Sequence, residues 1–419
     1  MGAEYFNFAL YVGLMLYLIV KKSKATALFI AGIWLFASFV GIFYYNSAIF
    51  RYSPHKLELM PFFFLFISFV ILITPLINQK KDVQKLEGNL AFVKIISVFY
   101  VILGIWPAFR VLIFLIESLI SGQFLANSMM YDDVADGFQE SRVEKELGYL
   151  GIKLLHLIAY FNLLMPIVVY YLYSKGEQKL AFAVFVITMI HPIYAVCYGN
   201  RTRLVFVGLY YISIYLFLKN LFTQELDEKL KKFIVTSGVS VLLLILSMSF
   251  ARFVMGSQYG ESSLASYLFQ YTAEGQYNFN NQGWHNERPL KGDMTLWYFK
   301  GLIEDSSRGG FHDRRLSISN KTNIPPHLFY SFPGQLFIDF SFMSLLILAV
   351  IAFCFSKIRL RGTIRLSTMY LFGFYLFMTC NSLFYLVYQV YSEFYIALLV
   401  GWTALYISEK NYSFINISK

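Results

Sequence analysis

The chain has 419 residues, of which 58% are hydrophobic and 14% are charged. Soluble domains carry roughly 25% charged residues, and a soluble chain could not bury this much apolar surface with so few charges. Most of the chain therefore needs a bilayer as its solvent. The formal net charge of +10 does not indicate nucleic-acid binding, because cytoplasmic loops of membrane proteins carry excess Lys and Arg for topological reasons.

Long apolar stretches recur along the sequence. A spanning helix needs about 20 mostly apolar residues, and internal prolines kink such a helix without excluding it. The expected fold class is an all-α integral membrane protein of about eleven transmembrane helices with a large, partly helical extracytoplasmic loop. The predicted spans are residues 5–20, 25–45, 59–77, 90–109, 151–173, 180–197, 204–218, 233–250, 335–355, 367–384 and 387–407.

Basic residues cluster in alternate connections between these spans. The positive-inside rule makes such connections cytoplasmic, so we expect the N-terminus outside and the tail, residues 408–419, inside. The five clusters are Lys21/Lys22/Lys24, Lys80/Lys81/Lys85, Lys175/Lys179, Lys219/Lys229/Lys231/Lys232 and Lys357/Arg359/Arg361/Arg365.

The spans divide the chain into three parts. Residues 1–250 are expected to hold helices one to eight, with an acidic outer loop at 121–149. Residues 251–334 form a large outer loop, and residues 335–419 hold the last three helices and a short cytoplasmic tail. Apolar residues at three- and four-residue spacing predict helices in the large loop at 262–277 and 293–304. A loop this long is functional or disordered, and its many aromatic residues favour a folded one.

Two arginines, Arg201 and Arg203, occupy the short turn at 199–203, which the predicted topology places outside. One interpretation is snorkelling to lipid phosphates. The other is a fork that grips a diphosphate, because guanidinium planes match phosphate geometry; Arg252 could join it. No phosphate-cradling glycine loop, paired-cysteine motif or HExxH helix occurs, so no cofactor or metal site is expected.

The large loop carries two further sets of candidate residues. Aromatic rings and amides around Glu274 make a plausible carbohydrate surface, although rings that pack onto the membrane domain would give the same composition. Glu274 is a candidate general base if burial shifts its proton affinity. The glycan-binding candidates are Tyr271, Tyr277, Asn278, Asn280 and Trp284. The second set, which offers charge and proton transfer, is His285, Arg288, His312, Asp313, Arg314, Arg315 and His327.

Adjacent aspartates, Asp132 and Asp133, stand in the acidic outer loop. Two carboxylates would begin a divalent-cation site. A solvated helix face is the preferred interpretation of this charge run, so we expect no metal there.

Two short motifs carry a family resemblance. Residues 198–204, YGNRTRL, look like the Gly-x-Arg stretch of the bacterial O-antigen or oligosaccharide repeat-unit polymerases (Wzy-type). Residues 323–326, NIPP, followed by 332–340, FPGQLFIDF, resemble the segment that leads from that family's large loop into the next helix. The family pattern continues with glycines where this chain has Ser341 and Ser344. The topology, with ten to fourteen helices and large outer loops in the family, is also similar.

The resemblance implies a GT-C-like glycosyltransferase in the bacterial cytoplasmic membrane that needs neither metal nor nucleotide. It would join undecaprenyl-diphosphate-linked repeat units into O-antigen of lipopolysaccharide, capsule or exopolysaccharide, with membrane lipids and a chain-length regulator as partners and no nucleic acid. Charge on the diphosphate would be stabilised by Arg201, Arg203 and Arg252, helped by the arginines at 314 and 315. Glu274, His285 and His327 compete as the general base.

Two main rival functions remain, besides an acyltransferase, for which the expected His–Asp-type pair near the membrane is not clear. An O-antigen ligase has a similar topology and a different acceptor. A polysaccharide flippase or exporter usually has compact loops and polar groups along a central cavity, whereas here the polar residues concentrate in one outer loop. Deletion of the gene followed by glycan gel analysis would separate these functions.

Overall fold

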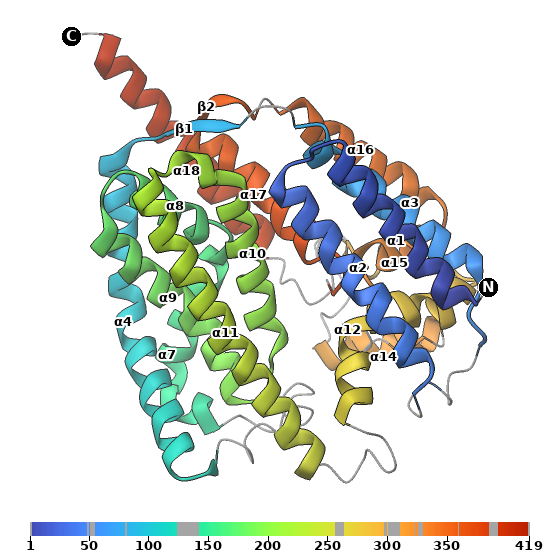
Figure 1. The fold of residues 1–419 in the computed structure, drawn as a ribbon. Coiled ribbons are helices and arrows are strands. Elements are labelled where there is room, and N and C mark those ends of the chain that lie inside the picture. Colours follow the sequence, from blue (N-terminus) through green and yellow to red (C-terminus); the bar gives the residue numbers. More distant parts are fainter. Residues whose placement is uncertain are drawn as a thin grey trace. The chain divides into compact units, whose positions relative to one another are not determined.

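The computed structural model of the chain is built mainly of helices (Figure 1). The described residues form two compact units, each assembled from segments far apart in the sequence. The structure describes residues 2–47, 50, 55–79, 82–123, 142–255, 264–296, 300, 311–322, 324–325, 330–358, 360–384 and 393–417. Those described as backbone only are residues 142, 251–255, 267, 311–316, 393–394 and 411–417.

Unit 1 consists of Met1–Lys80, Ser257–Ile358 and Met378–Ser392. Its first three helices pack on one another, the fourth apolar helix (α16) packs on α3, and a helix of the large loop (α12) packs along α2. Its elements are α1 (Ala3–Val20), α2 (Ala25–Tyr45), α3 (Leu59–Ile77), α12 (Leu264–Asn281), η5 (Gly283–His285), α14 (Phe311–Thr322), α15 (Phe332–Phe340) and α16 (Met343–Lys357).

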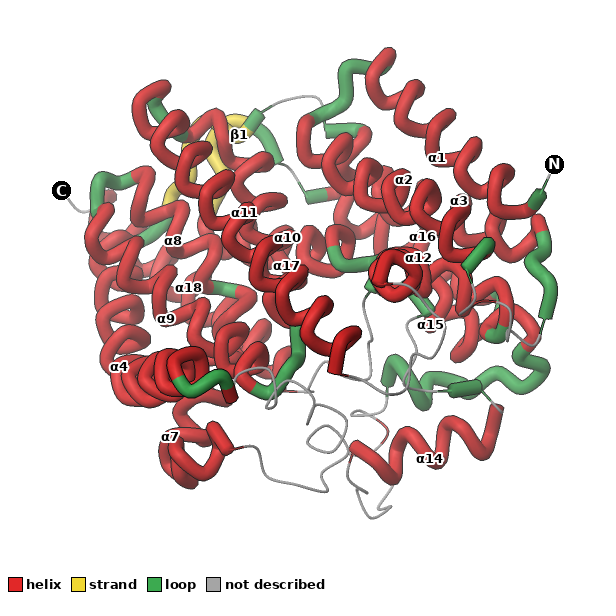
Figure 2. Tube along the Cα trace, turned by 60° about the horizontal axis from the view of Figure 1, so that its bottom comes forward, coloured by secondary structure: helices red, strands yellow, loops and turns green. Residues whose placement is uncertain are grey.

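Unit 2 consists of Lys81–Gly256, Arg359–Phe377 and Glu393–Lys419. Helix α4 packs against α7 and α9, and two short strands, β1 and β2, pair in parallel with Leu86 opposite Ile364; the strands are yellow in Figure 2. Its elements are β1 (Val83–Glu87), α4 (Leu90–Ile120), α7 (Arg142–Tyr160), η2 (Phe161–Leu163), α8 (Met165–Ser174), α9 (Gln178–Cys197), α10 (Thr202–Leu218), η3 (Lys219–Leu221), α11 (Gln224–Met255), β2 (Gly362–Arg365), most of α17 (Leu366–Cys380) and α18 (Glu393–Ile417).

Seven helices in the described part of the chain are long and apolar enough to cross a membrane: α1, α2, α3, α4, α9, α10 and α11. An eighth span results if α7 and α8, which bend by 64° at the break between them, count as one. The chain is therefore a multi-pass, all-α membrane protein. The predicted count of eleven is not confirmed, because α16 and α17 are shorter apolar helices and the predicted span 335–355 is broken between α15 and α16.

Local chemistry accounts for several helix ends. Helices α2 and α3 cover the same residues as the predicted spans 25–45 and 59–77, since each apolar run ends at polar residues. The Asn89 side chain caps α4 by accepting a hydrogen bond from the backbone N–H of Phe92, at 3.1 Å. Ser331 caps α15 in the same way, through the backbone N–H of Gly334 at 3.3 Å.

The basic connections gather on one face within each unit. In unit 1, Lys21 Nζ of the α1–α2 turn lies 3.4 Å from Asn78 Oδ1 at the end of α3. In unit 2, the β1–β2 pairing joins the connections before α4 and before α17, and η3 packs on β1. Lys94 at the start of α4 forms an ion pair with Glu177 of the α8–α9 connection, at 2.5 Å. These contacts join connections within one unit only, and the expectation that all five connections share one side stays a prediction.

The predicted loop helix at 262–277 corresponds to α12, which reaches deep into unit 1. Gln276 Nε2 donates to the backbone oxygen of Trp34 at 3.4 Å, and Asn7 Nδ2 donates to Gln276 Oε1 at 2.6 Å. Trp34 stands near the middle of α2, roughly 15 Å along the helix from either end at 1.5 Å per residue. Part of the loop therefore packs at the depth of the spanning helices. At the predicted helix 293–304 the structure describes turns over residues 291–295.

Candidate functional site

The predicted site residues fall in both units. In unit 2, α9 and α10 are joined by a tight turn. Gly199 has a φ of +93°, a backbone conformation that favours glycine. The side-chain oxygen of Asn200 accepts from the backbone N–H of Thr202 at 3.1 Å. The turn sets Arg201 immediately before α10 and Arg203 in its first turn.

Arg201 is enclosed by protein, with 3% of its surface exposed. Its Nη1 donates to the hydroxyl of Ser249 in α11, and that hydroxyl donates to the backbone oxygen of Ile245 at 2.7 Å. A snorkelling arginine keeps its charged head at the water interface. Snorkelling to lipid phosphates therefore does not describe Arg201.

Arg203 reaches back to α9, where its Nη1 donates to Nε2 of His191. A guanidinium has no acceptor atom, so Nε2 supplies the lone pair and the imidazole is neutral in this contact. His191 is 7% exposed and precedes Pro192, which lies inside the helix.

One turn further along α9, the Tyr194 hydroxyl donates to Glu144 Oε1 of α7 at 2.6 Å. We call Glu144, His191, Tyr194, Arg201, Arg203 and Ser249 the arginine site. Its two guanidinium groups and one carboxylate sum to a formal charge of +1. Such donors inside a low-dielectric bundle suit an anion with several oxygens.

Four members of the arginine site were not predicted as site residues: Glu144, His191, Tyr194 and Ser249. His191 and Tyr194 are three residues apart, which places both side chains on one face of α9. This spacing was the one feature of the sequence that could have pointed to them as site residues. The Ser249 and Glu144 contacts depend on tertiary packing.

In unit 1, α12 carries the predicted carbohydrate residues, and several are buried. Glu274 is 6% exposed and Tyr277 is fully buried. The Tyr277 ring packs edge-on against Tyr44, Phe50 and Phe62, with centroids 5.8, 6.0 and 5.3 Å away. Tyr277 is thus part of the core here. Tyr271 is half-buried, and Asn278 is 7% exposed.

Asn280 and Trp284 also make internal contacts. Asn280 accepts from the backbone N–H of Glu58 at 2.9 Å and donates to the backbone oxygen of Glu58 at 2.7 Å. Trp284 stacks on Phe337, with centroids 4.9 Å apart and planes at 14°. In this structure the first side chain holds the α2–α3 connection and the second packs on α15.

His285 lies on η5, directly after α12. Its ring stacks on that of His55, with centroids 4.2 Å apart, and its Nε2 lies 3.9 Å from Glu58 Oε1. The side chain is 28% exposed. Of the two predicted general-base candidates that the structure describes, His285 is partly exposed and Glu274 is buried.

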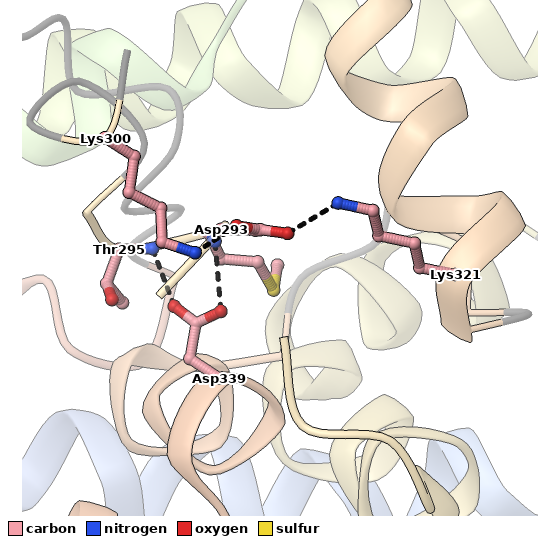
Figure 3. Close-up of polar contacts among 6 residues, drawn as sticks. Asp293, Thr295, Lys300, Lys321 and Asp339 are labelled. Carbon is pink, nitrogen blue, oxygen red and sulfur yellow. Dashed lines mark hydrogen bonds and ion pairs between the residues drawn. The ribbon is translucent and has the colours of Figure 1, made fainter. Parts of the chain in front are cut away.

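A charged cluster stabilises the large loop (Figure 3). Asp293 forms ion pairs with Lys300 at 2.6 Å and with Lys321 of α14 at 2.7 Å. The buried Asp339 carboxylate accepts from the backbone N–H groups of Met294 at 3.0 Å and Thr295 at 2.7 Å. Burial alone would raise the pKa of Asp293, but hydrogen bonds from the two lysines outweigh burial and hold that pKa below its usual range.

Other predicted residues are not described in full. Arg252, on α11, and Arg314 and Arg315, on α14, are described as backbone only, as are His312 and Asp313. His327, Asp132 and Asp133 lie outside the described residues, and Arg288 is exposed. Among the residues that are described, no three His, Cys, Asp or Glu side chains are grouped closely enough to hold a metal ion.

No family model, curated protein or solved structure matches this chain.

Proposed function

We propose that this chain is a membrane glycosyltransferase that joins undecaprenyl-diphosphate-linked oligosaccharide repeat units into a surface polysaccharide. The reaction takes place at the outer face of the bacterial cytoplasmic membrane. The observation that carries the proposal is the arginine site, where two arginines at the start of α10 donate to neighbouring helices: Arg201, which is buried, to Ser249 of α11, and Arg203 to the neutral imidazole of His191 in α9. Ionisable residues within membrane bundles mark functional sites by default.

The arginine site fits the leaving group of this reaction. An acceptor hydroxyl attacks the anomeric carbon of the donor sugar, and the bond from that carbon to the diphosphate oxygen breaks. Negative charge then grows on the diphosphate. Arg203, with the neutral His191 beside it, and Arg201, fixed by Ser249, supply donors that need no reorganisation as the charge develops. No metal or nucleotide takes part in this scheme.

The test is deletion of the gene, followed by gel analysis of surface glycan and of lipid-linked precursors. The proposal expects loss of the ladder while single repeat units are still attached and exported. Loss of all surface glycan, with lipid-linked precursor outside, would assign ligase activity instead.

Complementation with arginine variants tests the site itself. We expect Arg203→Ala to lower polymer formation about 100-fold or more, because it removes a transition-state donor, and Arg203→Lys to restore little, because an ammonium lacks the planar fork. The control is Arg110→Ala, which removes an arginine of α4 outside the arginine site. The Arg110 guanidinium lies over the Trp106 ring, 4.9 Å from its centroid. Normal polymer from Arg203→Ala, expressed at the control level, would refute the diphosphate role.

A flippase or exporter is the second candidate, and one feature of unit 1 favours it. The predicted span 335–355 is interrupted between α15 and α16, and buried polar contacts, such as Trp34 Nε1 to Ser382 Oγ at 3.0 Å, lie near the middle of α2. Interrupted helices and polar groups at mid-depth are typical of transporters. Deletion would then leave lipid-linked repeat units on the cytoplasmic side.

A further inference from the structure

The α2–α3 connection brings two chemically active side chains, His55 and Glu58, to His285. Asn280 makes two hydrogen bonds to the backbone of Glu58, and Asn281 Nδ2 donates to the backbone oxygen of His55. These bonds use backbone atoms of the connection, so its side chains remain available. The end of α12 therefore fixes where the Glu58 carboxylate and the His55 ring lie.

The two nitrogens of His285 have different surroundings. Nε2 is buried and has no hydrogen-bond partner among the described residues, and the nearest carboxylate oxygen, Glu58 Oε1, lies 3.9 Å away. That distance is too long for a hydrogen bond and short enough for an ion pair. The side chain is 28% exposed; because Nε2 is buried, Nδ1 is the ring nitrogen left to meet a substrate.

Two side chains face the His285 ring: the Glu58 carboxylate, 3.9 Å from Nε2, and the His55 ring, with centroids 4.2 Å apart. A carboxylate beside an imidazole stabilises the positive charge that forms when the ring takes a proton. The other charged residues next to His285 in the chain, Glu287 and Arg288, are exposed, where solvent screens them.

We propose that His55, Glu58 and His285 form a proton-transfer site for a sugar hydroxyl, an inference that rests on the proposed glycosyl transfer. Nδ1 of His285 takes the proton of the acceptor hydroxyl as its oxygen bonds to the anomeric carbon. The electron pair of the breaking bond leaves with the diphosphate, and the proton passes from His285 to water. Glu58 is a positioning residue: its carboxylate lies beside Nε2 at ion-pair distance and stabilises the imidazolium that forms during proton transfer.

The test compares Glu58→Gln with Glu287→Gln in purified full-length protein. Both remove one carboxylate, and neither touches the backbone bonds from the asparagines. We expect Glu58→Gln to lower turnover about tenfold and His285→Ala about 100-fold, with KM for the lipid-linked substrate unchanged. In Glu58→Gln the acid limb of the rate–pH profile should move to lower pH, and Glu58→Asp should recover part of the rate. Glu287→Gln should match the parent protein.

A second measurement, ¹⁵N NMR of the His285 ring, does not depend on turnover. At one mildly acidic pH, its protonated fraction should fall in Glu58→Gln and stay unchanged in Glu287→Gln. An unchanged fraction, or an unchanged rate and pH profile in Glu58→Gln, overturns the proton-transfer site while polymerisation by the parent protein stands. A parent protein that makes no polymer refutes the glycosyl transfer and with it the catalytic role of His285.

Discussion

Arg201 and Arg203 are two residues apart, yet their guanidinium groups bind different helices. Arg201 donates to Ser249 of α11 and Arg203 to His191 of α9. The sequence placed both arginines in one turn and assigned them a shared ligand. It could not supply their partners, because Ser249 lies 48 residues further along the chain and only packing brings it near. At the scale of single residues, then, residue types were predictable and contacts were not.

Asp293 gives a prediction for pH dependence. Its pKa is below the usual range in the folded protein, so its stabilising effect is complete above the unfolded value of about 3.9 and is lost as pH falls through the lower, folded pKa. We expect Asp293→Asn to destabilise the loop by about 1 kcal/mol at neutral pH. Hydrogen exchange of the Met294 and Thr295 amides, which Asp339 holds, measures this.

The difference in exchange between Asp293→Asn and the parent protein should shrink as the pH falls below about 4. Glu287→Gln removes an exposed carboxylate from the same segment and should leave both amides as protected as in the parent. Equal protection in Asp293→Asn at neutral pH would show that the lysine pairs do not stabilise this loop.

Among the elements, helices formed by one continuous apolar run, such as α2 and α3, have the predicted bounds. The predicted span that is broken into two helices does not. Residues 335–355 read as one apolar span, but the chain breaks at Ser341, which has a φ of +52°. Asp339, on the last turn of α15, binds the backbone of the 294–295 turn. That contact joins residues 44 positions apart in the chain, so no local sequence pattern predicts it. Composition therefore predicts where apolar helices lie but not where tertiary contacts end them.

The break at Ser341 predicts opposite effects for two similar substitutions. A non-glycine residue at this φ carries about 1 kcal/mol of strain or more, so Ser341→Gly should raise the free energy of unfolding by about 1 kcal/mol. Ser344, inside α16, donates from Oγ to the backbone oxygen of Ser341 at 2.6 Å. Ser344→Gly should lower stability by about 1 kcal/mol, because glycine weakens helices.

Thermal unfolding of both variants in detergent checks the pair. A rise in Tm for Ser341→Gly together with a fall for Ser344→Gly is the expected outcome. A fall in both would mean that the Ser341 backbone is not strained, or that its side chain contributes more than the strain costs.

For the whole molecule, the alternate basic clusters predict that five connections lie on the cytoplasmic side. Within unit 2, the β1–β2 pairing and the Lys94–Glu177 ion pair bring some of these connections together. The number of spans was less predictable, since α12 packs beside α2 at mid-depth although the sequence read it as part of an outer loop. Because α12 carries many polar residues, a hydropathy count does not reveal that this helix packs along α2.

Single cysteines test the orientation, after Ala replaces Cys197, Cys354 and Cys380. Labelled from outside intact cells with a membrane-impermeant maleimide, Lys56→Cys and Arg288→Cys should react, because the positive-inside rule puts them outside. Thr363→Cys, exposed on β2, should react only after the membrane is permeabilised. Labelling in the reverse pattern would invert the topology and remove the outer-face reaction.

The central claim is that this chain alone converts lipid-linked repeat units into polymer. The most direct measurement places purified protein in liposomes with undecaprenyl-diphosphate-linked repeat units and follows products by gel and by release of undecaprenyl diphosphate. We predict a ladder of increasing length with one lipid diphosphate released per bond, and neither product from Arg203→Ala. Repeat units that cross the bilayer but remain monomeric would contradict the account and assign transport instead.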